Sequence, residues 1–289
     1  LMGESTNGDV QRFKYNGKEL DRLHGLDWYD YGARQMDGMR FTTIDPLAEK
    51  YYGISPYVYC VDNPIKLIDR KGEEPTTYEA ALMAKHAYGE KVQLSGGWHV
   101  SDTQYESFIN AKNGFKSSLY ERTLDGVKEY AYATAGTESI NDFKEDVLQL
   151  VGNSSQYIES VKNAKKLSHD LAGYELTFVG HSLGGGLAAA NALATDKNAI
   201  TFNPAAISNA TKTNLQLPVS TTKGRIFNVI VKGEIVNYLQ SKIGLKPEGG
   251  NFNLDASYLP GNNIINTALR IRNHLINTVI KKIEEEQKR

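Results

Sequence analysis

The chain lacks several features on which other classes of protein depend. Its 289 residues include a single cysteine, Cys60, which excludes an internal disulfide framework. No cysteines and histidines have the spacing of a zinc site, and we expect neither a metal nor a cofactor. No apolar run approaches the ~20 residues that a helix needs to span a bilayer. Any chemistry is therefore expected to come from the chain's own side chains.

The chain also lacks an excess of charge of either sign. It has 33 Lys and Arg against 34 Asp and Glu, a formal net charge of −1 at pH 7. Domains that bind nucleic acid usually show an excess of basic residues, so no nucleic-acid partner is expected. The opening residues, LMGESTNGDVQRF, are polar and do not resemble a secretory signal peptide. They are typical of an internal stretch of a longer polypeptide.

Two regions of the chain differ in composition. Residues 13–72 are dense in tyrosine, glycine, aspartate, proline and arginine, and turn dipeptides such as Asn16-Gly17 and Asn63-Pro64 interrupt them. This pattern predicts short strands joined by tight turns. From about residue 75 onward, helical and strand-like patterns alternate, which is typical of an α/β domain. We therefore expect a short segment at 1–74 and one larger α/β domain at 75–289.

The second region predicts a regular series of elements. The spacing of apolar residues predicts helices over 77–86, 141–151, 154–171 and 266–288, and strands over 126–135, 176–179, 199–202 and 226–231. Residues 241–263 are rich in glycine, proline and asparagine and predict a long loop. Such a loop either covers or borders the acyl site, or is simply a surface loop of variable sequence.

The most informative stretch of the chain is LTFVGHSLGGGLA at residues 176–188. An apolar strand meets a Gly-x-Ser-x-Gly motif, and a helix rich in small residues follows. This order is typical of a nucleophile elbow, which exposes a serine hydroxyl on a sharp turn. Gly180 and Gly184 leave room where the strand and helix backbones come close. Ser182 is therefore the predicted nucleophile, and it needs a base and an oxyanion site.

The order of the catalytic residues along the chain indicates which histidine is the base. In α/β-hydrolase folds the triad residues occur in the order Ser, acid, His, and His274 alone among the six histidines follows Ser182. His274 is the predicted general base, the alternative being an ordinary histidine on the last helix. His181 adjoins Ser182, but adjacent side chains there point in opposite directions, so a structural role is expected for it.

Four carboxylates lie between the serine and the histidine, at Asp196, Glu234, Glu248 and Asp255. Glu234 comes directly after the apolar run 226–231 and Lys232-Gly233. In open α/β sheets, site residues gather just past the carboxyl ends of the strands, and Glu234 occupies such a position. Glu234 is the predicted acid, and Asp255, in the loop further along, is the alternative.

Residues 77–280 resemble the class 3 lipase family. After the strand at 126–135 come Gly136-Thr137, Asp142-Phe143 and Asp146, which match in order the residues that members carry beside their oxyanion site. The resemblance implies that the N–H of Thr137, with its hydroxyl, and the N–H of Leu183 stabilise the oxyanion. It also aligns residues 232–236 with the family's acid-bearing segment, which points to Glu234. One departure is Ala135, where the family usually has arginine.

Residues 13–72 resemble the Rhs repeat-associated core segment. The matches, in order, include Tyr15-Asn16-Gly17, Gly25-Leu26-Asp27-Trp28-Tyr29-Asp30, Asp45-Pro46-Leu47-Ala48 and Asp62-Asn63-Pro64. The resemblance implies a delivered effector whose toxin begins near Glu73. The family's closing Asp-Pro-x-Gly-Leu is Asp69-Arg70-Lys71-Gly72-Glu73 here, so self-cleavage after Gly72 is left open. Asp45 and Asp69 are either turn caps or the remnant carboxylates of that cleavage.

Together the two resemblances imply an antibacterial effector that hydrolyses membrane phospholipids or other acyl esters. It would be secreted with a secretion-machine carrier, delivered into a target bacterium to act at its periplasm or membrane, and blocked by a cognate immunity protein. Two alternatives stay open. In the first, the chain is a non-enzymatic binding module with a decayed hydrolase domain. In the second, it is a thioesterase or peptidase of the same fold.

Overall fold

The structure is a computed structural model of the 289-residue chain. It describes residues 19–21, 28–30, 35–37, 42–43, 75–124, 126–136, 154–221, 224–256 and 263–286. The chain divides into two units, one formed by Leu1–Glu74 with Glu285–Arg289 and the other by Pro75–Glu284. The first boundary falls at the residue where the composition changes.

The first unit contains a small antiparallel sheet. Its strands are β1 (Glu19–Asp21), β2 (Trp28–Asp30) and β3 (Gln35–Met36), in that order across the sheet. Beyond β3, the Thr42 N–H donates to the Gln35 carbonyl at 2.7 Å. Cys60, Asp45, Asp69 and Gly72 lie outside the described residues.

The second unit is built around a mixed sheet, which within the described residues has eight strands. Its order is β11-β10-β9-β8-β7-β6-β4, with β5 paired to β6. Neighbouring strands from β7 to β11 run parallel, and β6 and β4 continue the sheet antiparallel. The bounds are β4 His99–Val100, β5 Ile109–Asn110, β6 Phe115–Leu124, β7 Val127–Thr134, β8 Glu175–His181, β9 Asn198–Phe202, β10 Ile226–Val231 and β11 Gly250–Leu254.

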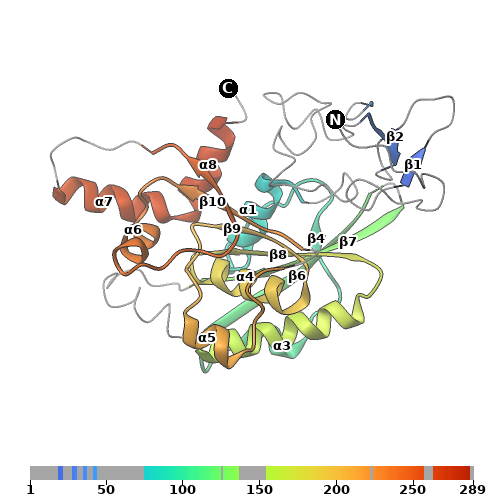
Figure 1. Cartoon of the computed structure of the whole chain (residues 1–289), viewed down its shortest axis with the longest axis horizontal. Helices are drawn as coiled ribbons and strands as arrows, with labels where there is room; N and C mark the ends of the chain where they lie inside the picture. The colour runs from blue at the N-terminus through green and yellow to red at the C-terminus, as the bar shows by residue number, and fades with distance from the viewer. Residues whose placement is uncertain are drawn as a thin grey trace, which may run out of the picture. The chain divides into compact units, whose positions relative to one another are not determined.

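Helices cover both faces of this sheet. Figure 1 shows α3 and α4 on one side and α1 and α8 on the other, and two separate apolar clusters lie beneath them. Successive residues of β8 alternate between the faces, with Phe178 in the first cluster and Val179 in the second. The bounds are α1 Thr77–His86, α3 Ser154–Asp170, α4 Leu183–Thr195, α5 Asn209–Asn214, α6 Ile235–Lys242, α7 Asn263–His274 and α8 Ile276–Glu286, with a short 3₁₀ helix at Glu106–Phe108.

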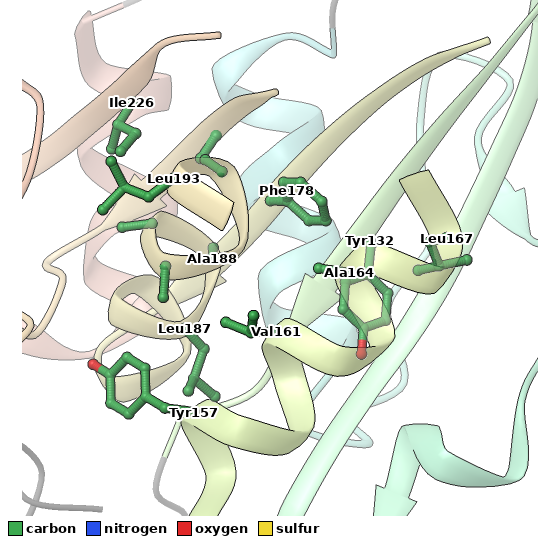
Figure 2. Close-up of a cluster of buried hydrophobic side chains, with 14 of the residues drawn as sticks. Tyr132, Tyr157, Val161, Ala164, Leu167, Phe178, Leu187, Ala188, Leu193 and Ile226 are labelled. Atoms are coloured by element: carbon green, nitrogen blue, oxygen red, sulfur yellow. The ribbon is translucent and has the colours of Figure 1, made fainter. Parts of the chain in front are cut away.

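The contact between α3 and α4 fills the first face. Val161, Ala164 and Leu167 recur at helical spacing on α3 and lie in the first cluster. In Figure 2, Val161 lies beside Leu187 and Ala188 of α4, while Leu167 lies further along α3, away from α4. A side chain on Gly186 would collide with the Tyr157 hydroxyl, since an added Cβ would lie 2.4 Å from it. The glycines and alanines of α4 therefore let the two helices pack closely.

Most of the elements that the sequence predicts for the second unit occur where they are expected, and the α/β-hydrolase fold is confirmed. Parallel strands alternate with helices on two faces, and the serine motif joins the central strand β8 to α4. The helix expected over 141–151 lies outside the described residues.

Two expectations about the C-terminal part are wrong. The single helix expected over 266–288 is two helices, which break at Leu275 because the carbonyl of His274 bonds to side chains of other elements. The long loop expected over 241–263 contains the edge strand β11, which pairs along five residues of β10. Backbone pairing with a strand that is already formed overrides the turn-like composition of this stretch.

Arg122 of β6 lies at the centre of a buried ionic cluster. Its Nε donates to Glu129 at 2.8 Å and its Nη1 donates to Glu79 at 3.3 Å, while the guanidinium lies 4.7 Å from the centre of the Trp98 ring. Glu79 also closes a capping box with Thr76 at the start of α1. The cluster thus joins the first turn of α1 to β6 and β7.

Within the described part of the chain, no helix is long and apolar enough to cross a bilayer. The same residues contain no group of three or more His, Cys, Asp or Glu side chains that could hold a metal ion.

We predict that Arg122→Met lowers the free energy of unfolding by about 3–5 kcal/mol, because two buried carboxyls lose their cation. Urea denaturation followed by circular dichroism measures the change. The triple variant E79Q/R122M/E129Q should be more stable than the single one, since it leaves no buried charge unpaired. A loss below about 1 kcal/mol in R122M would show that the cluster contributes little.

Candidate active site

Ser182 lies on the sharp turn between β8 and α4. Its φ of 60° and ψ of −127° are a backbone conformation that residues other than glycine rarely adopt. Hydrogen bonds on both sides hold it there. The Ser182 N–H donates to the Phe202 carbonyl at 3.0 Å, and its own carbonyl accepts from Gly185 at 3.0 Å and Ala205 at 2.9 Å. The strained turn presents the hydroxyl at the carboxyl end of the sheet.

The two glycines of the motif occupy positions with no room for a side chain. A Cβ on Gly180 would lie 2.1 Å from the Gly184 carbonyl oxygen, and one on Gly184 would lie 2.1 Å from the Thr134 carbonyl oxygen. All of these neighbours are backbone atoms, which cannot turn aside. The close approach of strand and helix that the motif predicts is present in the structure.

His274, the last residue of α7, contacts the nucleophile. Its Nε2 lies 2.9 Å from Ser182 Oγ, and its Nδ1 lies 2.5 Å from Glu234 Oε2. The His274 and Glu234 side chains are buried. A histidine whose Nδ1–H donates to a carboxylate keeps Nε2 free to accept the serine proton.

Glu234 is fixed in place by the start of α6. It follows β10 and a left-handed Gly233 with φ 65°, and it forms the N-cap of α6. Its Oε2 accepts from the Val236 N–H at 2.9 Å, and its Oε1 accepts from the Asn237 N–H at 2.6 Å. A carboxylate is stabilised at a helix N-terminus, so one group both caps α6 and bonds to His274.

The other three carboxylates between Ser182 and His274 lie in different surroundings. Asp255 pairs with Lys232 at 2.6 Å and its side chain is 65% exposed. Glu248 pairs with Lys212 at 2.5 Å. Asp196 ends α4 in a left-handed conformation. The structure therefore places Glu234, the predicted acid, against His274 Nδ1.

The structure describes one of the two predicted oxyanion donors. Leu183 begins α4, so its N–H is among those of the first turn that have no intrahelical carbonyl, and it lies next to the nucleophile. Gly136 lies against Ser182, since an added Cβ there would be 3.1 Å from Ser182 Cβ. Thr137, the other predicted donor, lies outside the described residues.

The His181 ring forms hydrogen bonds with groups other than the Ser182 hydroxyl. Its Nε2 lies 2.6 Å from the His274 carbonyl oxygen, and its Nδ1 lies 2.8 Å from the Tyr88 hydroxyl. Because a carbonyl can only accept, Nε2 is the donor and Nδ1 accepts from Tyr88. Burial, reinforced by the neighbouring His274, lowers the pKa of His181 to about 3. His181 is thus a neutral imidazole and not a second base.

Two residues of this site were not identified from the sequence. Tyr88 follows α1 and bonds to His181, and Asn203 follows β9 and donates from Nδ2 to the His274 carbonyl at 3.0 Å. The only local signal is at Asn203, because an asparagine directly after a strand favours a left-handed turn. Nothing in the sequence points from either residue to His274.

The known proteins that this chain resembles are phospholipases and lipases. A family model of phospholipase-like proteins, described as the Tle-like phospholipase domain, matches residues 79–282, more than half of the chain. The chain belongs to that family. Its second unit is an ester-hydrolase domain of the lipase and phospholipase type, as the sequence predicts. Because the match begins at residue 79, it does not bear on residues 13–72.

One curated relative is an extracellular phospholipase A1 from Serratia liquefaciens. It is 36% identical over 155 residues, which are 50% of this chain and 47% of the relative. The chain thus spans about half the length of the curated relative that it matches.

Solved structures of fungal lipases are also similar. A triacylglycerol lipase from Penicillium expansum has a TM-score of 0.44 and 17% identity, over 63% of this chain and 80% of that one. The Rhizomucor miehei lipase in its native propeptide complex has a TM-score of 0.44 and 16% identity, over 62% and 67%.

We predict that His181 makes the protein less stable in acid. Its pKa is about 3 in the folded state against about 6.5 for a free histidine, so between these values only the unfolded state binds the proton. The free energy of unfolding should then fall as pH falls below 6.5, with a contribution approaching 1.4 kcal/mol per pH unit. Urea denaturation between pH 4.5 and 7.5 should show a shallower fall for His181→Gln. Equal slopes in both proteins would refute a buried neutral His181.

Proposed function

We propose that this chain is a serine hydrolase that cleaves an acyl ester of phospholipids through Ser182, His274 and Glu234. The observation that supports it is the pair of hydrogen bonds from Ser182 Oγ to His274 Nε2 and from His274 Nδ1 to Glu234 Oε2. These bonds occur on a nucleophile elbow in a chain of a phospholipase-like family. A decayed domain would have no need to keep the three side chains in this arrangement.

The geometry accounts for each step of acyl transfer. His274 Nε2 takes the proton of Ser182 as the serine oxygen attacks the ester carbonyl, and Glu234 stabilises the imidazolium that forms. The imidazolium then protonates the leaving alcohol, which leaves an acyl-serine. Water, deprotonated by the same nitrogen, attacks the carbonyl of the acyl-serine. The bond from the acyl carbon to Ser182 Oγ then breaks, the imidazolium returns its proton to Oγ, and the fatty acid is released.

The developing oxyanion needs donors that are already in place. The Leu183 N–H, at the start of α4, is one of them, and the positive end of the helix dipole adds to it. Thr137, one residue after Gly136, is the proposed second donor, through its N–H and its hydroxyl.

The phospholipase-like family supports phospholipids as the substrate class. The Serratia relative is named an extracellular phospholipase A1, which supports cleavage at the sn-1 position and secretion of this chain. The motifs in residues 13–72 support a role as an Rhs-type antibacterial effector, delivered by a secretion-machine carrier into a target bacterium. Because such an enzyme would damage its own producer, a cognate immunity protein is part of this proposal.

We predict that the protein releases palmitate, and not oleate, from vesicles of 1-palmitoyl-2-oleoyl phosphatidylcholine, and that Ser182→Ala lowers kcat about 10⁶-fold. Mass spectrometry of the released fatty acid measures both. Ser155→Ala, at an exposed serine of α3, serves as the control with wild-type turnover. Ester hydrolysis that survives S182A would contradict the proposed nucleophile, and release of oleate would contradict the sn-1 assignment alone.

The two candidate acids give a second prediction. Glu234→Gln should lower kcat by about 10⁴-fold, because the amide favours the wrong tautomer of His274 and no longer stabilises its cation. Asp255→Asn is the matched control and should keep wild-type kcat, since Asp255 is ion-paired with Lys232 at an exposed position. Steady-state hydrolysis of a short-chain p-nitrophenyl ester measures both. The reverse order of effects would make Asp255 the acid.

A further inference from the structure

The backbone carbonyl of His274 has two side-chain donors from other elements. His181 Nε2 lies 2.6 Å from this oxygen and Asn203 Nδ2 lies 3.0 Å from it. His274 ends α7, and the last carbonyls of a helix have no intrahelical N–H to accept from. Here buried side chains supply the donors.

Asn203 connects this carbonyl to the sheet. It follows β9 with a φ of 42°, and its side chain is fully buried. Its Nδ2 also donates to the Asn273 carbonyl at 3.1 Å, and its Oδ1 accepts from the Val231 N–H at 2.9 Å. Its own N–H donates to Val229. The end of α7 is therefore fixed to the ends of β9 and β10.

His181 connects the same carbonyl to the nucleophile's own turn. It is the last residue of β8 and directly precedes Ser182. The Tyr88 hydroxyl donates to its Nδ1 and fixes the tautomer in which Nε2–H points at His274. The His181 ring lies 4.9 Å from the His274 ring, centre to centre. Being neutral, it does not oppose the positive charge that His274 gains during the reaction.

We propose that His181 and Asn203 are positioning residues. Together they donate hydrogen bonds to the His274 carbonyl and so set the distance from His274 Nε2 to Ser182 Oγ. This rests on the proposed function. These two hydrogen bonds are needed because His274 lies at the break between α7 and α8, where the series of helical hydrogen bonds is interrupted. A displacement of about 1 Å at a reacting group can cost 10²-fold in rate.

Substitutions at the two donors separate positioning from stability. His181→Leu removes the Nε2–H donor, and His181→Gln keeps an N–H donor at a similar distance from the backbone. Asn203→Gly removes the amide while allowing the positive φ. The matched control is His86→Leu, because His86 also bonds to a tyrosine hydroxyl, that of Tyr120 at 2.9 Å, and has no place in the proposed site.

We expect H181L and N203G to lower kcat for a short-chain p-nitrophenyl ester by about 10- to 100-fold, with KM unchanged within twofold. H181Q should recover most of the kcat, and H86L should match the wild type. Thermal unfolding of each variant checks that it is folded at the assay temperature. If H181L does not fold, the comparison of N203G with wild type still decides the matter.

Four outcomes would overturn the proposal. These are wild-type kcat in folded H181L and N203G, an H181Q as slow as H181L, an effect confined to KM, and loss of folding in H181L and N203G alike, which would make the contacts purely structural. Failure of the proposed function is recognised separately. Either the wild-type protein would not hydrolyse esters, or S182A would still do so, and the positioning role would then fall with it.

Discussion

His274 lies at the break between α7 and α8, and three of its polar atoms form hydrogen bonds with residues of other elements. Nε2 faces Ser182, Nδ1 faces Glu234, and the backbone carbonyl faces His181 and Asn203. A histidine between a hydroxyl and a carboxyl gives a nucleophile only if both distances hold at once. The rest of the site depends on this placement, since the elbow and the acid would otherwise lack a shared base.

The parallel sheet supplies the other positions. Ser182 follows β8, Asn203 follows β9 and Glu234 comes three residues after β10, so three neighbouring strands deliver their polar residues to one edge. Because strands β7 to β11 run parallel, their carboxyl ends meet there. The cost of the strained serine is offset by the backbone bonds around its turn and by the two buried apolar layers beneath it.

Much of this site could be predicted because its signals lie in the order of residues along the chain. Ser182 is marked by flanking glycines between a strand and a helix, Glu234 by its place after an apolar strand, and His274 by chain order.

The break at Leu275 could not be predicted, because the apolar spacing continues through it and the cause is a tertiary bond to the His274 carbonyl. The hydrogen bond from Asn203 to the His274 carbonyl could not be predicted either, since it joins residues 71 positions apart. Likewise, β11 forms in a stretch of turn-like composition because β10 offers it a partner.

The central claim is that Ser182, His274 and Glu234 act as one catalytic unit. The most direct measurement is a crystal structure of the protein after reaction with an organophosphonate ester. The account predicts phosphorus bonded to Ser182 Oγ, His274 Nε2 within hydrogen-bond distance of that oxygen, and the phosphonyl oxygen at the N–H groups of Leu183 and Thr137. A phosphonate on another side chain, or one on Ser182 with its oxygen pointing away from Leu183, would contradict it.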